Sequence, residues 1–165
     1  ALAPLRAFGL ARVVVTTMQA VSGAGYPGVP SLDILGNVVP YIGGEEDKME
    51  RETQKILGND GGRQPHDVVI SAHTNRVPVI DGHTMTVSVE FATRVEPAAV
   101  VAAMQAFSGR PQELGLPTAP VPAQRSRNRV SSSIRGARTL KRVSRSRSEV
   151  GRVLLSGGLL STRPR

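Results

Sequence analysis

The chain has 165 residues, of which 39% are hydrophobic and 21% are charged. This length and composition allow one ordinary globular domain and argue against a wholly disordered chain. No apolar run approaches the roughly 18 to 20 residues of a membrane-spanning helix, and the first residues do not resemble a signal peptide, so we expect a cytoplasmic protein. Because the chain contains no cysteine, disulfides, thiolate metal sites and a thiol nucleophile are excluded within it.

The net charge of +8 is distributed unevenly along the chain. Residues 1–120 hold 9 Lys and Arg against 12 Asp and Glu, a net charge of −3, whereas residues 121–165 hold 12 against 1, a net charge of +11. The second segment is rich in Arg and Ser and contains no aromatic residue. The composition therefore predicts a domain over residues 1–120, followed by a disordered basic tail over residues 121–165.

The first half of the predicted domain reads as a strand, a turn and a helix. The β-branched run Arg12–Thr17 predicts a buried strand, and the glycine-rich segment Gln19–Pro30 predicts a tight loop. A helix is expected between Gly44 and Gly58, because three acidic residues at its start complement the positive end of the helix dipole.

The second half predicts three more strands and a second helix. Asp67–Ala72 reads as a strand, and Arg76–Ile80 as another that is interrupted by a proline. Thr84–Phe91 alternates polar and apolar residues, as expected of a strand with one buried face. Apolar residues at helical spacing follow Pro97 and stop at Gly109. These patterns predict an α+β fold, a mixed sheet of about four strands with two or three packed helices.

Three motifs occur in order along the domain: QAVSGAG from Gln19, EEDK from Glu45 and RVPVIDGHT from Arg76. Together they resemble the catalytic and dimerisation domain of the aspartate-semialdehyde dehydrogenases, as do PSLDILGNVVPYIGGEEDKME and PQELGLPTAP. The resemblance covers about residues 1–120. It implies a glyceraldehyde-3-phosphate-dehydrogenase-like C-terminal domain, truncated at both ends, and a homodimer. It also implies NADP-dependent interconversion of aspartyl phosphate and aspartate semialdehyde, a step of lysine, methionine and threonine biosynthesis.

The resemblance also implies roles for single residues. His83 matches the family's general acid and base, a role that suits an imidazole with an ordinary pKa near 6.5. Gln19 matches the glutamine that orients the nucleophile and the substrate. Ser22 and Gly23 lie in the glycine-rich loop and match positions beside the cofactor.

Three charged residues match the family's substrate-binding positions. Arg76 matches the residue that binds the substrate carboxylate, which a planar guanidinium can hold through two parallel hydrogen bonds. Glu45 matches the residue that meets the substrate amine, and Lys48 the residue that meets phosphate. These two residues are three positions apart, so a helix places both on one face.

Other interpretations remain open at the level of sequence. Taken singly, these residues would be ordinary surface charges and turn residues, and His66 and His73 match no motif. The family's cysteine is expected a short way before Ala1 and its Rossmann domain is also absent, so the resemblance implies a fragment, which could be a non-catalytic dimerising one. The Arg/Ser-rich tail could bind nucleic acid, since VSRSRSE at residues 143–149 resembles serine-arginine repeats, or it could be an out-of-frame translation.

Overall fold

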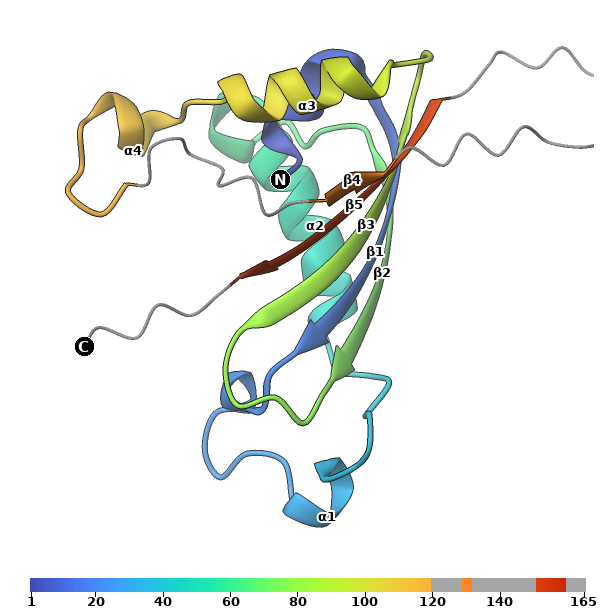
Figure 1. The fold of residues 1–165 in the computed structure, drawn as a ribbon, viewed down its shortest axis with the longest axis vertical. Coiled ribbons are helices and arrows are strands. Elements are labelled where there is room, and N and C mark those ends of the chain that lie inside the picture. The colour runs from blue at the N-terminus through green and yellow to red at the C-terminus, as the bar shows by residue number, and fades with distance from the viewer. Residues whose placement is uncertain (120–128, 132–150, 160–165) are drawn as a thin grey trace, which may run out of the picture.

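The computed structural model describes residues 1–119, 129–131 and 151–159 as one mixed β-sheet with helices packed on it (Figure 1). Its strands are β1 (Leu10–Gln19), β2 (Val69–Arg76), β3 (His83–Phe91), β4 (Arg129–Ser131) and β5 (Gly151–Leu159). The strand order is β2-β1-β3-β5-β4, in which β1 and β2 are parallel and the other pairs are antiparallel. The α+β class predicted from the sequence is confirmed.

Four α-helices and three 3-10 segments complete the described fold: α1 (Ser31–Ile34), α2 (Glu45–Leu57), α3 (Pro97–Ala106), α4 (Arg110–Glu113), η1 (Ala3–Phe8), η2 (Val21–Ala24) and η3 (Asp60–Gly62). In the described part of the chain, no helix has the length and apolar character needed to cross a membrane. The two longer helices are those that the sequence predicts. α2 begins directly after Gly44, whose φ of 76° suits glycine, and α3 has Pro97 in its first turn.

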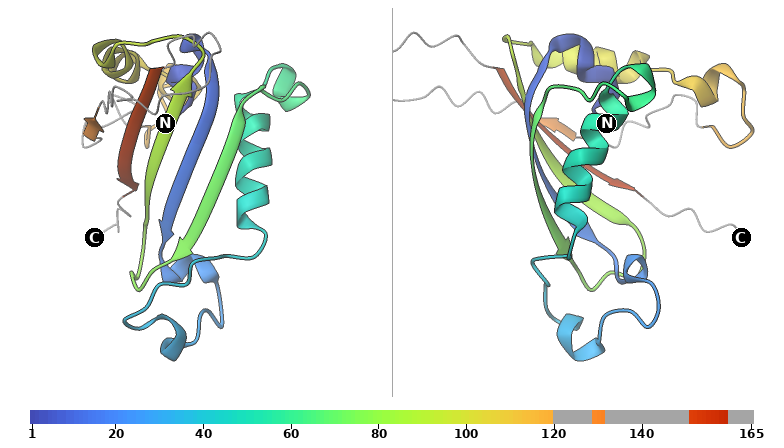
Figure 2. Two further views of the ribbon diagram at one scale, coloured as in Figure 1. Left: turned by 90° about the vertical axis from the view of Figure 1, so that its right-hand side faces the viewer. Right: turned by 180° about the vertical axis from the view of Figure 1, so that it is seen from behind.

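The two longer helices lie on one face of the sheet, and the other face is open (Figure 1, Figure 2). α2 runs beside the edge strand β2, α3 and η1 lie together over one end of the sheet, and α1 lies beyond the other end. The core beneath the helices is mainly aliphatic: Leu5, Leu10, Val13, Val15, Leu57, Val68, Ile70, Ala72, Val87, Val89, Phe91, Val100 and Met104. The loops around α1 lie beyond the end of the sheet, away from this core (Figure 1).

Alternating burial along the strands decides which side chains face the helices. On β1, Val13 and Val15 are buried, whereas Val14 between them is 37% exposed. β3 alternates in the same way, so the prediction that Thr84–Phe91 is a strand with one buried face is confirmed. Any residue of these strands can therefore be assigned to the core face or to the open face by its position.

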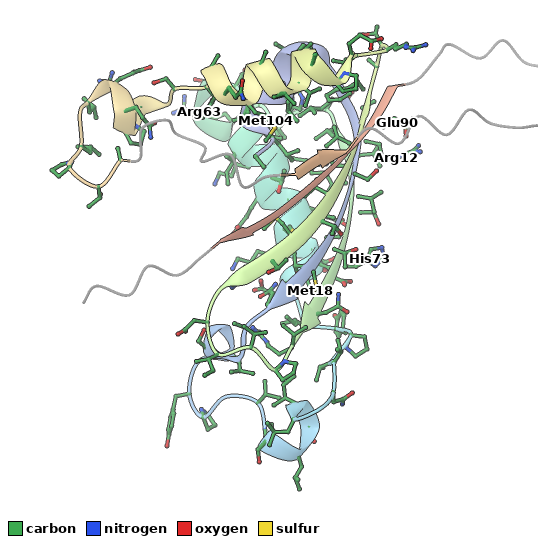
Figure 3. The ribbon with its side chains drawn as sticks, viewed as in Figure 1. Arg12, Met18, Arg63, His73, Glu90 and Met104 are labelled. Atoms are coloured by element: carbon green, nitrogen blue, oxygen red, sulfur yellow. The ribbon has the colours of Figure 1, made fainter. Side chains whose placement is uncertain are left out.

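The open face carries mostly polar side chains, and four of its residues are labelled in Figure 3: Arg12, His73 and Glu90, which are polar, and Met18. Arg12 Nη1 lies 3.5 Å from Glu90 Oε2 in an ion pair between β1 and β3. His73 is an exposed residue of the edge strand β2 and lies on the same face. No helix of the described residues covers these side chains.

One predicted strand is wrong. The sequence predicts separate strands at Asp67–Ala72 and Arg76–Ile80, but the structure has the single strand β2, which ends at Arg76. Pro78 has no N–H to donate to a strand ladder, and the Val77 N–H donates instead to the Gln19 carbonyl oxygen, at 3.0 Å. The chain therefore leaves the sheet after Arg76 and returns to it at His83.

The basic tail is described only in part. Arg129–Ser131 and Gly151–Leu159 form β4 and β5, and β5 pairs along the whole of β3. The structure thus describes two short segments of the tail as strands, and the disorder of the tail stays a prediction. The remaining tail residues, and with them the SRSRS run that motivated the nucleic-acid interpretation, lie outside the described residues.

Candidate functional site

Three of the predicted site residues form one row across the sheet. Gln19, the last residue of β1, pairs in register with Arg76, the last residue of β2, and with His83, the first residue of β3. Register partners on neighbouring strands point to the same face, and here it is the core face, where Gln19 and Arg76 are only 4% and 5% exposed. Residues that are up to 64 positions apart in the sequence (19 and 83) therefore meet at one end of the sheet.

The glycine-rich loop closes over this row. A Cβ atom added at Gly23 would lie 2.9 Å from Arg76 Nη1 and 3.6 Å from His83 Nε2. Both nitrogen atoms are thus within 4 Å of one point, although their strands are separated by β1. A side chain at position 23 would therefore press against the guanidinium, and glycine allows the loop to approach both Arg76 and His83 closely.

Backbone hydrogen bonds fix the loop against the segment that returns from β2 to β3. The Val21 N–H donates to the Val79 carbonyl oxygen at 2.8 Å, and the Ser22 N–H donates to the Ile80 carbonyl oxygen at 3.2 Å. The segment predicted as a strand is thus a loop that supports η2. This pairing places Ser22 and Gly23 at the rim of the row, where both are exposed.

The Arg76 guanidinium is buried and is held by the backbone. Its Nη1 donates to the Ala20 carbonyl oxygen at 2.8 Å. Among residues 1–119, no Asp or Glu forms an ion pair with it. Buried charges are usually paired, and a guanidinium has five N–H donors, so the one bond to Ala20 leaves capacity to bind an anion. This arrangement suits the carboxylate of a small ligand.

The Gln19 side chain is oriented by a hydrogen bond to Thr17, two residues earlier on β1. Its Nε2 donates to Thr17 Oγ1 at 3.3 Å, which leaves the amide oxygen directed elsewhere. Thr17 is the register partner of Thr74 on β2, and both threonines are fully buried. A layer of two threonines therefore separates the polar row from the aliphatic core.

His83 is the titratable member of the row. The imidazole is half-buried at the start of β3, and its Nε2 is the atom that faces Gly23. An imidazole in this position can accept a proton from, or return it to, a group that is bound beside the guanidinium. The two other histidines are not part of the row: His73 lies on the open face, and His66 lies after η3, beyond the far end of α2.

Glu45 and Lys48 form a separate pair on the first turn of α2. Lys48 Nζ lies 3.6 Å from Glu45 Oε1, and the two side chains are 54% and 35% exposed, respectively. The prediction that both residues share one helix face is confirmed by this pair. The structure does not bring either residue into hydrogen bonding with the row.

The side chains that join α2 to β2 were not predicted from the sequence. The Thr74 N–H donates to Glu46 Oε1 at 2.9 Å, and the Ala72 N–H donates to Glu50 Oε1 at 3.1 Å. Gln54 extends the same helix stripe and donates from Nε2 to the Val68 carbonyl oxygen at 3.0 Å. The four-residue spacing of Glu46, Glu50 and Gln54 was the available signal, but it does not by itself identify a strand edge as the partner.

The described residues contain no group of three or more His, Asp or Glu side chains that could hold a metal ion. The row itself offers amide, guanidinium and imidazole groups, which can form hydrogen bonds, carry charge and transfer a proton.

Similarity to characterised proteins agrees with this geometry. The family model of the semialdehyde dehydrogenase dimerisation domain matches residues 2–135. Aspartate-semialdehyde dehydrogenase of Schizosaccharomyces pombe is 54% identical over 120 residues, and that of Methanothermobacter thermautotrophicus is 52% identical over 116 residues. Each alignment covers 69% of this chain but only 34% and 33% of the relative, so the chain spans about a third of the length of these relatives.

A solved structure shows the same fold. The crystal structure of aspartate semialdehyde dehydrogenase with NADP from Candida albicans superimposes with a TM-score of 0.62 at 33% sequence identity. The match covers 94% of this chain and 49% of that chain. Because the family model matches most of the sequence, and the relatives and the fold agree with it, the chain belongs to the semialdehyde dehydrogenase dimerisation-domain family.

Proposed function

We propose that this chain supplies the substrate-binding and proton-transfer part of an aspartate-semialdehyde dehydrogenase active site. The observation that carries the proposal is the buried Arg76, which has no ion-pair partner among residues 1–119 and lies in one row with Gln19 and His83. An amino acid semialdehyde offers what this row can recognise, namely a carboxylate and a carbonyl group that exchanges a proton.

Each residue has a role that follows from its position. Arg76 binds the substrate carboxylate with the donors that Ala20 does not use. His83 moves a proton at Nε2, on the side that faces Gly23. Gln19 orients the reacting group between them through its amide, which Thr17 holds in place.

We assign Glu45 and Lys48 on α2 to the two charged groups that Arg76 does not bind, the substrate amine and phosphate. Glu45 meets the substrate amine and Lys48 meets phosphate, since a carboxylate complements an ammonium and an ammonium complements an oxyanion. Their mutual ion pair at 3.6 Å is partly solvent-exposed, so it contributes little to stability and can be exchanged for ligand contacts.

We assign the cofactor to the exposed side of η2. Ser22 and Gly23 lie at the exposed rim of the row, next to the imidazole, and would hold part of the cofactor there. NADP, when bound, supplies the hydride acceptor. The chain contains no cysteine, so the thiol nucleophile comes from outside these 165 residues.

We also propose that two copies of this domain associate through the open face of the sheet. The matched family model is a dimerisation domain, and the open face lacks a covering helix among the described residues. Val14 and Val69 are 37% and 59% exposed on it. A second copy would remove these apolar side chains from water.

The experiment is a chimera in which residues 2–119 replace the matching third of the Schizosaccharomyces pombe enzyme. If the proposal is correct, this chimera oxidises aspartate semialdehyde in the presence of NADP and phosphate at a rate close to that of the parent enzyme. A matched chimera that carries His83→Ala and Arg76→Ala together measures the background. A folded, dimeric chimera without turnover would contradict the proposed function.

A further inference from the structure

β2 is an edge strand, and α2 covers its free edge (Figure 2). On one side β2 pairs with β1, so its other side would expose unpaired backbone N–H and C=O groups. Side chains of α2 occupy this edge: Glu46 accepts from the Thr74 N–H, Glu50 accepts from the Ala72 N–H, and Gln54 donates to Val68. Helix and strand are therefore joined by hydrogen bonds as well as by packing.

The spacing of these bonds follows from the geometry of the two elements. Glu46 and Glu50 are four residues apart, about 6 Å along a helix axis at a rise of 1.5 Å per residue. Thr74 and Ala72 are two residues apart, about 6.6 Å along a strand. The two repeats match, so successive turns of α2 reach successive outward N–H groups of β2, with the helix running antiparallel to the strand.

The bond nearest to the functional site is Glu46 to Thr74, at 2.9 Å. Glu46 is adjacent to Glu45 and two residues before Lys48 on the first turn of α2. Thr74 is two residues before Arg76 on β2. This single bond thus connects the helix turn that carries one pair of charged groups to the strand end that carries the guanidinium.

A second contact supports the same strand end. Val39, in the segment before α2, exchanges two backbone hydrogen bonds with Arg76: the Val39 N–H donates to the Arg76 carbonyl oxygen at 3.0 Å, and the Arg76 N–H donates to the Val39 carbonyl oxygen at 2.8 Å. Val39 therefore holds the backbone of Arg76 at the free edge of β2, and the bond from Thr74 to Glu46 fixes the position of α2 relative to this strand end.

We infer that Glu46 is a positioning residue: its hydrogen bond with the Thr74 N–H holds Glu45 and Lys48 in place relative to Arg76. The inference rests on the proposed function, since it assigns Glu45 and Lys48 to the same ligands as Arg76. Glu50 makes the equivalent bond one turn farther from the site and serves as the internal comparison. Glu52 is exposed on α2 and serves as the surface control.

The first test uses amide hydrogen exchange and NMR of the 165-residue chain. Glu46→Ala should accelerate exchange of the Thr74 amide roughly 10-fold or more, because a hydrogen bond to a charged acceptor is lost, and should shift the Arg76 Nε–H resonance. Glu50→Ala should act on the Ala72 amide and leave the Arg76 resonance in place. Glu46→Gln retains an acceptor oxygen and should resemble the parent chain.

The second test uses the kinetics of the chimera. Glu46→Ala should raise KM for both phosphate and aspartate semialdehyde by about 10-fold, because misplaced binding groups are costly. Glu46→Gln should restore both values, and Glu50→Ala should change them less than Glu46→Ala does. Glu52→Ala should leave them unchanged.

The outcomes separate this inference from the proposed function. An active chimera in which Glu46→Ala leaves both KM values unchanged, or in which Glu46→Gln fails to restore them, overturns the positioning role. If the chimera that carries no Glu46 substitution is inactive, the proposed function is contradicted. The positioning role of Glu46 is then tested by the NMR measurements alone. In that arm, an unchanged Thr74 exchange rate or an unmoved Arg76 resonance overturns it.

Discussion

Arg76 donates a hydrogen bond from Nη1 to the carbonyl oxygen of Ala20, at 2.8 Å, where the parallel strands β1 and β2 end. The bond joins residues that are 56 positions apart and directs a buried guanidinium toward the glycine-rich loop. It also leaves most of the donors of Arg76 available.

His83→Ala should lower kcat of the chimera strongly. Proton transfer by a positioned side chain typically contributes on the order of 100-fold to 10,000-fold. His73→Ala is the matched control, because His73 lies on the open face of the sheet and should leave kcat close to the parent value. Steady-state kinetics of both variants would measure the effect. Equal losses in the two variants would contradict the assignment of His83.

Arg76→Lys should raise KM for aspartate semialdehyde more than it changes KM for phosphate. An ammonium cannot hold both a carboxylate and the Ala20 carbonyl group in the planar geometry of a guanidinium. The loss of one charged hydrogen bond, about 1.5 to 3 kcal/mol, corresponds to a KM roughly 10-fold to 100-fold higher. Arg12→Lys, on the open face, is the control and should change neither value.

Lys48→Ala should raise KM for phosphate by roughly 10-fold, because a charged hydrogen bond to an oxyanion is lost. KM for the semialdehyde should change less. Lys55→Ala, at the other end of α2, removes the same charge from the same helix and should have no such effect. Phosphate kinetics that are the same in both variants would show that Lys48 has no role in phosphate binding.

Gly23→Ala should destabilise the isolated chain. The added methyl group would lie 2.9 Å from Arg76 Nη1, and this nitrogen is fixed by its bond to Ala20. Overpacking at such a point costs typically about 1 to 3 kcal/mol, roughly 5-fold to 150-fold in the folding equilibrium. Gly43→Ala has open space around its Cβ and should be nearly neutral. Urea unfolding of both variants would decide the matter, and equal midpoints would contradict the close approach.

The chain should self-associate in analytical ultracentrifugation. Thr86 is exposed on the open face of β3. Thr86→Lys should shift the chain toward monomer, because the dimer would then bury a charge between its two copies. Glu52→Lys adds the same residue on the outer side of α2 and should not change association. A monodisperse monomer at high concentration would contradict the proposed homodimer.

Local sequence patterns were sufficient for several elements of this fold. Period-2 alternation identified β3, and flanking glycines identified both ends of α2, because these signals depend on neighbours in the chain. The same local reasoning failed at Arg76–Ile80, where β-branched residues suggested a strand. The Pro78 ring and the bond from Val77 to Gln19 turned that segment into a loop.

The sequence by itself determined which residues are candidates for the site, since the three motifs carry Gln19, Arg76 and His83 in order. Only the tertiary structure decided that these three share one row and that Glu46 bonds to Thr74. The reason is physical. Strand register and helix-to-strand contacts arise from hydrogen bonds between segments far apart in the chain, and no local pattern specifies which partner will complete them.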